Sequence, residues 1–198
     1  STEALKLKEV PKHLIVVGGG VIGLELGQVY NRLGSEVTVI EFQERIIPNM
    51  DSSLSRELAK VFKKTGVNIN TSHKVTSIKR EGNSVIVSAD NKSGESLNFE
   101  GDYCLISIGR SAYTDGLGLE NIGIQTDRHG RVEVNENLQT SIPNIYAIGD
   151  VVKGMMLAHK AEEEGVFVAE HINGQKPHIN HNLIPVSYTH LRAHETYV

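Results

Sequence analysis

A glycine-rich turn near the amino terminus constrains the fold of this chain more than any other feature. Residues 14–17 read LIVV, a continuous and mostly β-branched apolar run that is typical of a parallel strand buried on both faces. The sequence GGGVIGLELG follows at once and predicts a helix over residues 20–33, which Gly34 ends. A second buried strand is expected at residues 37–40. Strand, helix and strand then form one βαβ unit with a right-handed crossover.

Three of these glycines have the spacing of a nucleotide-binding turn. Gly18, Gly20 and Gly23 match G-x-G-x-x-G, in which the first glycine makes the tight turn, the second lets a pyrophosphate approach and the third lets helix and strand pack closely. The free N–H groups at the start of the helix would bind the phosphates. The alternative is a purely structural turn, because glycine-rich joints between strands and helices are common.

Acidic residues near this turn add to the prediction. Glu41 ends the second strand 18 residues after Gly23, close to the position of a carboxylate that binds a ribose hydroxyl. Such a carboxylate repels a 2'-phosphate, so NAD is favoured over NADP. Arg45, four residues on, could complicate this preference, but an exposed loop arginine is more often just solvated. Glu25 is either a first-turn acid favoured by the helix dipole or a group near the reactive end of the nucleotide.

The remainder of the first unit continues this pattern. Asp51 is expected to cap a helix that ends at Gly66 and carries Leu54, Leu58, Val61 and Phe62 on one side. A strand is expected at residues 67–70. The runs KVTSIKR, SVIVSAD and SLNFE alternate with a period of two and predict an antiparallel meander, followed by a return strand at residues 103–107.

A second constellation lies nearer the carboxyl terminus. Short strands are expected at residues 132–134 and 145–147, and a helix begins near Leu157 with Ala158, Ala161, Gly165, Val168, Ala169 and Ile172 on a small-residue face. Asp150 follows the second strand and could bind a polyol hydroxyl, while the start of the helix could face an electron-rich ring. Alternatively, Asp150 caps a turn and His159 is an exposed helix residue.

Composition excludes several classes of function. The net charge is −4, with 20 basic and 24 acidic residues and no long run of one sign, so no nucleic-acid or polybasic membrane surface is expected. No apolar stretch approaches the ~20 residues that span a bilayer, and no signal peptide is recognisable, so a soluble cytoplasmic protein is expected. Cys104 is the single cysteine, and one cysteine allows neither an internal disulfide nor a two-thiol redox centre.

Together these segments resemble a known family. GGGVIGLELG, paired with IPNIYAIGDVVKGMMLAHKAEEEG and joined by LISIGR, resembles the dihydrolipoamide dehydrogenase family of flavoprotein pyridine nucleotide-disulfide oxidoreductases. The resemblance extends from the amino terminus to about Pro185. It implies an α/β fold, with a Rossmann-like NAD-binding domain (a parallel sheet with an antiparallel meander) and part of an FAD-binding domain.

The resemblance also implies roles for individual residues. The NAD pyrophosphate loop would consist of Gly18, Gly19, Gly20, Val21, Ile22, Gly23, Leu24 and Glu25, with Glu25 near the nicotinamide. Glu41 would hold the adenosine ribose, Val75 would lie against the adenine and Gly109 would meet the nicotinamide side. Asp150 would bind the ribityl chain of FAD, and the helix start under the flavin ring would consist of Met156, Leu157, Ala158 and His159. Dihydrolipoamide would reduce a disulfide to a dithiol, the dithiol would reduce FAD, and the reduced FAD would pass a hydride to NAD.

The chain departs from the family in three respects. It has no amino-terminal FAD-binding glycine loop with paired redox cysteines and no carboxy-terminal dimerisation domain with a His–Glu pair. Cys104 lies in an apolar strand, where a lone cysteine is usually a core residue, and is not expected to be catalytic. The sequence after Thr189 does not fit the family, so His190, His194 and Glu195 are not expected to form a catalytic pair or a metal site.

We therefore expect an internal and by itself inactive fragment of an NAD- and FAD-dependent dihydrolipoamide dehydrogenase. Residues 1–8 would be a linker, 9–130 the NAD-binding domain, 131–185 part of the FAD-binding domain and 186–198 a non-native tail. The expected partners of the whole enzyme are the lipoyl domains of 2-oxo-acid dehydrogenase or glycine-cleavage complexes, and the expected assembly is a homodimer. There are two alternatives. The chain could be a fragment of another member of the same flavoprotein group, such as a soluble pyridine nucleotide transhydrogenase, or it could be a stand-alone NAD-binding module.

Overall fold

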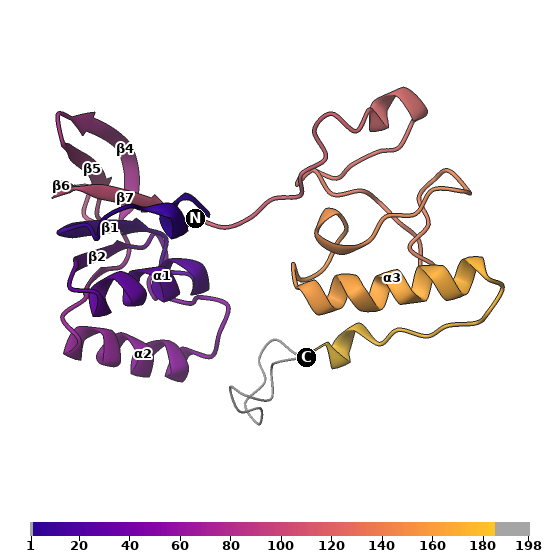
Figure 1. Ribbon diagram of the computed structural model, residues 1–198, viewed down its shortest axis with the longest axis horizontal. Coiled ribbons are helices and arrows are strands. Elements are labelled where there is room, and N and C mark those ends of the chain that lie inside the picture. Colours follow the sequence, from indigo (N-terminus) through magenta and orange to yellow (C-terminus); the bar gives the residue numbers. More distant parts are fainter. Residues whose placement is uncertain (1, 185–198) are drawn as a thin grey trace. The chain divides into compact units, whose positions relative to one another are not determined.

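The computed structural model describes residues 2–184, and the predicted tail at 186–198 lies outside the described residues. The chain divides into two compact units, one up to Gly109 and one from Arg110 onward (Figure 1). Each unit has its own elements. In the described part of the chain, no helix is both long and apolar enough to cross a membrane.

A parallel sheet forms the centre of the first unit. Its four strands have the order β3-β2-β1-β7, with β1 at His13–Val17, β2 at Glu36–Ile40, β3 at Asn68–Asn70 and β7 at Tyr103–Ile106. All three pairings are parallel. Helix α1, Val21–Arg32, connects β1 to β2, and helix α2, Ser52–Lys64, precedes β3. This is the predicted βαβ arrangement, and α1 falls within the predicted range because Gly20 and Leu33 are its caps.

The second sheet of this unit is the predicted antiparallel meander. It has the order β4-β5-β6, with β4 at Lys74–Glu81, β5 at Ser84–Asp90 and β6 at Ser96–Gly101. Both pairings are antiparallel. The helices cover one face of the parallel sheet, and the meander packs against the other (Figure 1).

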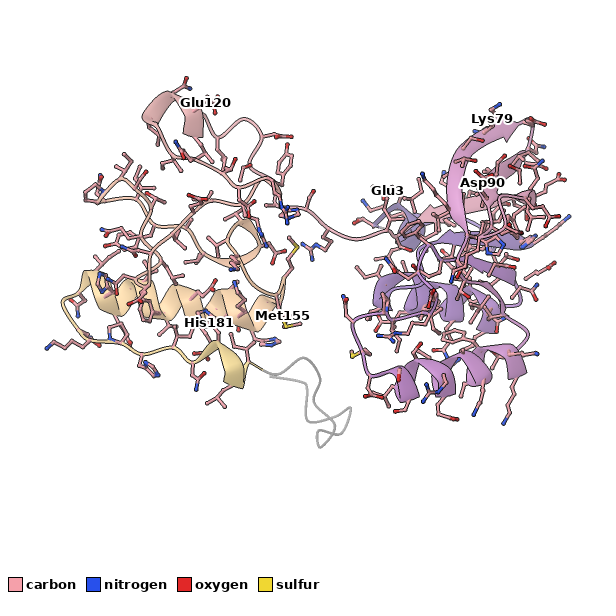
Figure 2. The ribbon with its side chains drawn as sticks, turned by 180° about the vertical axis from the view of Figure 1, so that it is seen from behind. Glu3, Lys79, Asp90, Glu120, Met155 and His181 are labelled. Carbon is pink, nitrogen blue, oxygen red and sulfur yellow. The ribbon has the colours of Figure 1, made fainter. Side chains whose placement is uncertain are left out.

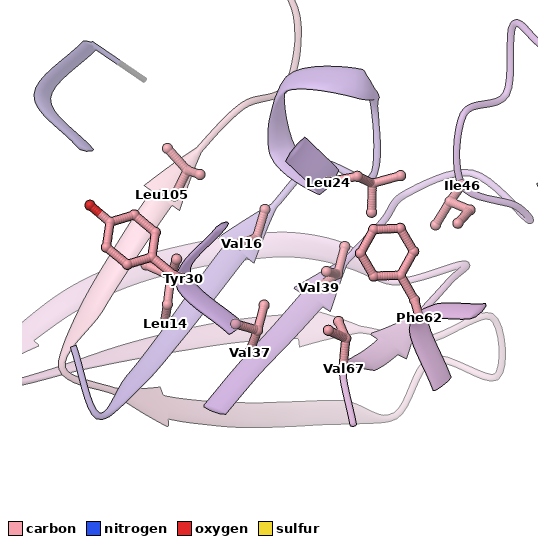
Figure 3. Packing of buried hydrophobic residues seen from close by; sticks show 10 residues of the cluster. All are labelled: Leu14, Val16, Leu24, Tyr30, Val37, Val39, Ile46, Phe62, Val67 and Leu105. Carbon is pink, nitrogen blue, oxygen red and sulfur yellow. The ribbon is translucent and has the colours of Figure 1, made fainter. Parts of the chain in front are cut away.

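Alternating side chains of β1 join the three layers. Leu14 and Val16 belong to the cluster that contains Leu24 of α1 and Phe62 of α2 (Figure 3). Ile15 and Val17 belong to the other cluster, whose buried members from the meander are Val87 and Ala89. Because successive side chains of a strand point to opposite faces, a continuous apolar run is required when both faces are covered. The sequence LIVV meets this requirement.

The buried face of helix α2 coincides only in part with the predicted one, because Leu58 and Phe62 belong to it and Leu54 and Val61 do not. Leu54 and Val61 are 57% and 49% exposed, and the buried residues are Ser55 and Phe62, with Leu58 and Ala59 half-buried. Positions 55, 58, 59 and 62 form one stripe of a helix with 3.6 residues per turn. Ser55 can be buried in this stripe because its hydroxyl donates a hydrogen bond to the carbonyl of Ile46 at 2.7 Å.

The second unit contains one long helix, α3, at Ala158–Ile172. Short 3-10 helices lie at Leu119–Ile122, Gly149–Val151 and His181–Leu183. The strands predicted at 132–134 and 145–147 are wrong, because these segments form only the isolated bridges Thr126–Val132 and Gln139–Tyr146. The described residues of this unit contain no sheet on which the small-residue face of α3 could pack. The buried residues of α3 are Lys160, Glu164 and Phe167.

The boundary between the units also differs from the predicted one at residue 130. Residues 111–130 belong to the second unit, and their bonding partners lie in that unit. Asp127 forms an ion pair with Arg131 at 2.6 Å, and the Thr114 hydroxyl donates to the Gly130 carbonyl at 3.2 Å. At the other end, residues 2–6 form a 3-10 helix that packs on the first unit, where the Tyr30 hydroxyl donates to the carbonyl of Ala4.

Candidate functional site

Gly18, in the turn after β1, and Gly23, in the first turn of α1, are explained by packing alone. Gly18 has a φ of +109°, and a Cβ atom there would lie 2.5 Å from the carbonyl oxygen of Ser107. A Cβ atom on Gly23 would lie 2.2 Å from the carbonyl oxygen of Gly18 and 2.5 Å from the hydroxyl of Ser107. Glycine is therefore required at both positions whether or not a ligand binds.

Gly20 is different, because nothing in the chain requires a glycine there. Its φ is −79°, and a Cβ atom on it would meet no other atom within 4 Å. Gly20 is the N-cap of α1, and no side chain caps this helix end. The first N–H groups of an uncapped helix are free to bind an anion. The backbone at Gly20 thus presents an open surface to an approaching phosphate group.

The carboxylate of Glu41 is bound directly to this turn. Its Oε2 atom accepts a hydrogen bond from the Gly19 N–H at 2.6 Å, and its Oε1 atom accepts one from the Gln43 N–H at 2.6 Å. Glu41 is only 7% exposed. Each carboxylate oxygen has a second lone pair, so hydroxyl groups can still bind to the same carboxylate.

Ser107, the residue after β7, holds the turn from the other side. The Ser107 N–H donates to the Val17 carbonyl at 2.8 Å, and the Ser107 hydroxyl donates to the carbonyls of Val17 and Gly18 at 3.1 and 3.3 Å. The sequence offers no signal for this role of Ser107. The carboxyl ends of β2, β1 and β7 therefore meet around the glycine turn, at the edge where open α/β sheets bind their ligands.

The other predicted residues of the first unit lie around the same edge. Val75 is in β4, two residues after His73, whose N–H donates to the carbonyl of Glu41 at 2.9 Å. Gly109 follows β7 with a φ of +124° and is exposed. Glu25 is an exposed residue in the first half of α1.

The second unit brings together the second predicted group. Asp150 lies in the 3-10 helix Gly149–Val151, and its Oδ2 atom pairs with the Arg110 guanidinium at 2.5 Å. Leu157 is the N-cap of α3, which has no side-chain cap, and α3 begins with Ala158 and His159. Met156 precedes them and is half-buried. The sequence does not point to Arg110 as the partner of Asp150, because 40 residues separate them.

Neither a metal centre nor a reactive thiol is present in the part of the chain that the structure describes. No group of three or more His, Cys, Asp or Glu side chains there could hold a metal ion. Burial raises the pKa of the Cys104 thiol to about 11, so the thiolate that would act as a nucleophile is disfavoured. Cys104 lies in β7 and packs against the cluster of Ile15 and Val17.

The first unit has the fold of the Rossmann-type dinucleotide-binding domains. Its parallel sheet, its glycine turn leading into an uncapped helix and its carboxylate at the end of the next strand define that class. The chain matches the family described as pyridine nucleotide-disulphide oxidoreductase over residues 1–165, and it belongs to this family.

Curated relatives agree with this assignment. The chain is 47% identical to the mitochondrial dihydrolipoyl dehydrogenase of Dictyostelium discoideum over 194 residues, which are 96% of this chain and 40% of the relative. It is 46% identical to the mitochondrial dihydrolipoyl dehydrogenase of Schizosaccharomyces pombe, with coverages of 96% and 38%. The leghemoglobin reductase of Glycine max is 44% identical, with coverages of 96% and 36%. The chain thus spans about two fifths of the length of these relatives.

Solved structures show the same fold. The flavoprotein disulfide reductase RclA of Escherichia coli, in its Cu(II) complex, is similar with a TM-score of 0.80 and 31% identity, over 87% of this chain and 39% of RclA. LpdA of Mycobacterium tuberculosis is similar with a TM-score of 0.77 and 34% identity, over 86% of this chain and 36% of LpdA.

Proposed function

We propose that this chain binds NAD through its first unit and provides part of an FAD site through its second, within a dihydrolipoamide dehydrogenase. The observation that carries the proposal is the pair of features around the glycine turn: the open backbone at Gly20 and the anchored carboxylate of Glu41. Membership of the pyridine nucleotide-disulphide oxidoreductases supports it, and the names of the relatives from Dictyostelium and fission yeast supply the activity.

In this proposal, the NAD site is built from the carboxyl edge of the parallel sheet. The first N–H groups of α1 bind the pyrophosphate, and Glu41 accepts hydrogen bonds from the adenosine ribose. Val75 lies against the adenine, and Glu25 and Gly109 lie on the nicotinamide side. The full set of proposed NAD-binding residues is Gly18, Gly19, Gly20, Val21, Ile22, Gly23, Leu24, Glu25, Glu41, Val75 and Gly109.

The choice of NAD over NADP follows from the charge of Glu41. This carboxylate is almost fully buried and held by two backbone N–H groups, so it cannot swing away from a 2'-phosphate. Two negative groups at hydrogen-bonding distance repel each other strongly in a buried site. NADPH is therefore expected to bind more weakly than NADH.

The FAD part of the proposal concerns the second unit. Asp150 accepts hydrogen bonds from the ribityl chain, in exchange for or beside its ion pair with Arg110. The uncapped start of α3, with Met156, Leu157, Ala158 and His159, lies under the flavin ring, where the positive end of the helix dipole stabilises an electron-rich ring. When bound, the flavin and the nicotinamide supply the hydride chemistry, and the protein positions them.

The thiol chemistry of the proposed reaction does not come from this chain. Its single cysteine, Cys104, is partly buried with a raised pKa, and a disulfide needs two thiols. We therefore expect the 198-residue chain alone to bind NADH but not to oxidise dihydrolipoamide.

Partners and location belong to the same proposal. The lipoyl domains of 2-oxo-acid dehydrogenase or glycine-cleavage complexes would deliver the substrate of the whole enzyme, which we expect to be a homodimer. A cytoplasmic location stays a prediction, and the relatives from Dictyostelium and fission yeast are mitochondrial proteins.

Calorimetric titration of the chain with NADH and with NADPH tests the proposal, repeated with Glu41→Ala. We expect saturable binding of NADH, poorer binding of NADPH and loss of NADH affinity in the variant. A cooperatively folded chain that binds neither nucleotide would rule out the NAD site.

A further inference from the structure

Helix α3 buries a pair of opposite charges that the proposed NAD and FAD contacts do not use. Lys160 and Glu164 lie one turn apart, their side chains are 3% and 1% exposed, and the Lys160 Nζ atom is 2.7 Å from Glu164 Oε1. Removing two charges from water costs several kcal/mol per ion and is only partly offset by their attraction. Stability alone is therefore a weak reason for this pair, and its other contacts suggest a different role.

Both charges of the pair contact the backbone of one residue, Gly149. Glu164 Oε2 accepts a hydrogen bond from the Gly149 N–H at 2.7 Å, and Lys160 Nζ donates to the Gly149 carbonyl at 3.3 Å. Gly149 is itself buried, with a φ of +74° that favours glycine. The two polar groups of this residue are thus held by one ion pair.

The chain also encloses the pair from two sides. Nε2 of His181 lies 3.1 Å from Glu164 Oε1, on the segment that runs back alongside α3 (Figures 1 and 2). Gly154 lies over Lys160, since a Cβ atom on Gly154 would be 2.7 Å from Lys160 Cε. Oε1 of Glu164 therefore accepts hydrogen bonds from two side chains, and Oε2 accepts one from the Gly149 N–H.

The geometry at Gly149 determines where Asp150 lies. The Gly149 carbonyl belongs to the planar peptide unit that contains the Asp150 N–H and Cα atoms, so contacts that hold the N–H and the carbonyl of Gly149 fix the point from which the Asp150 side chain extends. The carboxylate of Asp150 remains accessible, with its side chain 35% exposed. Since Lys160 and Glu164 are on α3, the separation between Asp150 and the start of α3 is fixed by the same contacts.

We propose that Lys160 and Glu164 form a positioning pair that holds the Gly149 peptide so that the Asp150 carboxylate is presented to the polyol hydroxyls of a flavin nucleotide. The identity of the ligand rests on the proposed function, whereas the positioning of the turn rests on the contacts alone. Hydrogen bonds to charged groups are stronger and shorter than neutral ones, which suits a turn that must be ordered before its ligand arrives.

Two double variants, both without the Lys160 charge, separate positioning by the acceptor at residue 164 from the removal of charge. In Lys160→Met with Glu164→Gln, both charges are gone, but the amide oxygen can still accept from the Gly149 N–H. In Lys160→Met with Glu164→Leu, the volume is filled and no acceptor remains. Glu163→Gln is the matched control, because it makes the same glutamate-to-glutamine change at an exposed neighbouring residue. The measurements are amide hydrogen exchange by NMR on the 198-residue chain and quenching of flavin fluorescence on titration with FAD.

The proposal predicts that the leucine double variant exchanges the Gly149 amide roughly tenfold to a hundredfold faster than the glutamine double variant, since a hydrogen bond to this group is worth about that factor. The leucine double variant should also bind FAD more weakly than the glutamine double variant, by a similar factor. The amides of residues 165–170 should exchange at the same rate in both variants. Equal exchange at Gly149 in the two variants overturns the proposal, as does faster exchange throughout α3. Unequal exchange with equal FAD affinity overturns the presentation of Asp150.

The wild-type chain distinguishes this proposal from the proposed function. If it does not bind FAD while its Gly149 amide is protected from exchange, the FAD assignment of the second unit fails. The positioning of the turn is then judged by the exchange rates of the two double variants.

Discussion

The carboxylate of Glu41, at the end of β2, accepts a 2.6 Å hydrogen bond from the backbone N–H of Gly19, in the turn between β1 and α1. The two residues are 22 positions apart, yet this bond joins the proposed ribose-binding group to the proposed phosphate-binding turn. A charge-assisted bond between them fixes their relative position before any ligand binds. Such pre-organisation lowers the cost of ordering the site on binding.

Replacing this carboxylate should weaken both the fold and the binding of NADH. Glu41→Gln leaves one acceptor oxygen for the N–H groups of Gly19 and Gln43, so one of them loses its partner, at a cost of about 1–3 kcal/mol. Glu36→Gln makes the same change at the exposed start of the same strand and should alter stability little. Urea unfolding of the two variants measures the difference. Equal midpoints would show that the Glu41 contacts carry no stability.

Two glycines on one face of α1 should respond to alanine in opposite directions. Gly23→Ala places a Cβ atom 2.2 Å from the Gly18 carbonyl oxygen and should destabilise the chain by about 3 kcal/mol. Gly27→Ala meets Val37 and Val16 only at 3.4 and 3.6 Å, and should stabilise the helix by about 0.5–1 kcal/mol. Thermal unfolding monitored by circular dichroism distinguishes them. A Gly23→Ala variant as stable as the wild type would contradict the close packing of α1 on β1.

The Cys104 thiol should be nearly inert in the folded chain. Its pKa is raised by burial from 9.0 to about 11, so at pH 8 its thiolate fraction is about a hundredfold lower than that of an ordinary thiol. Reaction with a chromogenic disulfide should be correspondingly slow and become fast in denaturant. Rapid reaction of the native chain would contradict this.

The same shift predicts a pH dependence of stability. Because the folded state disfavours the thiolate, the contribution of Cys104 is complete below the ordinary pKa of 9.0 and is lost as the pH rises towards about 11. Cys104→Ala should remove this part of the alkaline loss of stability. Unfolding midpoints of the two proteins between about pH 7 and pH 10 test it, and parallel curves would refute it.

The amino terminus of α2 should be sensitive to acid. The hydroxyl and the N–H of Ser53 donate to the Asp51 carboxylate, and these bonds lower the pKa of Asp51. A lowered pKa means that the ionised cap stabilises the folded state at neutral pH, and that this contribution is lost as the pH falls through the folded-state value. Asp51→Asn should therefore be less stable than the wild type at pH 7 and similar to it near pH 2. A difference that is the same at both pH values would exclude the charge as the cause.

The first unit is largely predictable from sequence because its signals are local. The LIVV run of β1, the N-cap Gly20 and the end of α1 depend on residues close together in the chain. The buried face of α2 is harder to predict, since Ser55 is buried only because the Ile46 carbonyl accepts its hydroxyl. The strands expected at 132–134 and 145–147 depend on partner strands, and the described residues of the second unit offer them none.

For the candidate site, the sequence identifies single residues better than their partners. The glycine spacing and Glu41 are visible as a pattern, and Asp150 as an acid at the end of an apolar run. The contacts that fix them come from distant positions: Ser107 holds the glycine turn, Arg110 pairs with Asp150, and Glu164 holds Gly149. The i,i+4 spacing of Lys160 and Glu164 looks like an ordinary exposed helix pair, and only their burial reveals a different environment.

The central claim is that the glycine turn of this chain binds a dinucleotide, and NMR on the isotope-labelled 198-residue chain tests it most directly. On titration with NADH, the amide signals of residues 18–25 and of Glu41 should move saturably and more than those of the second unit, and NADPH should produce smaller shifts. If NADH leaves the signals of residues 18–25 unchanged in a folded chain, the glycine turn is only a structural joint between β1 and α1.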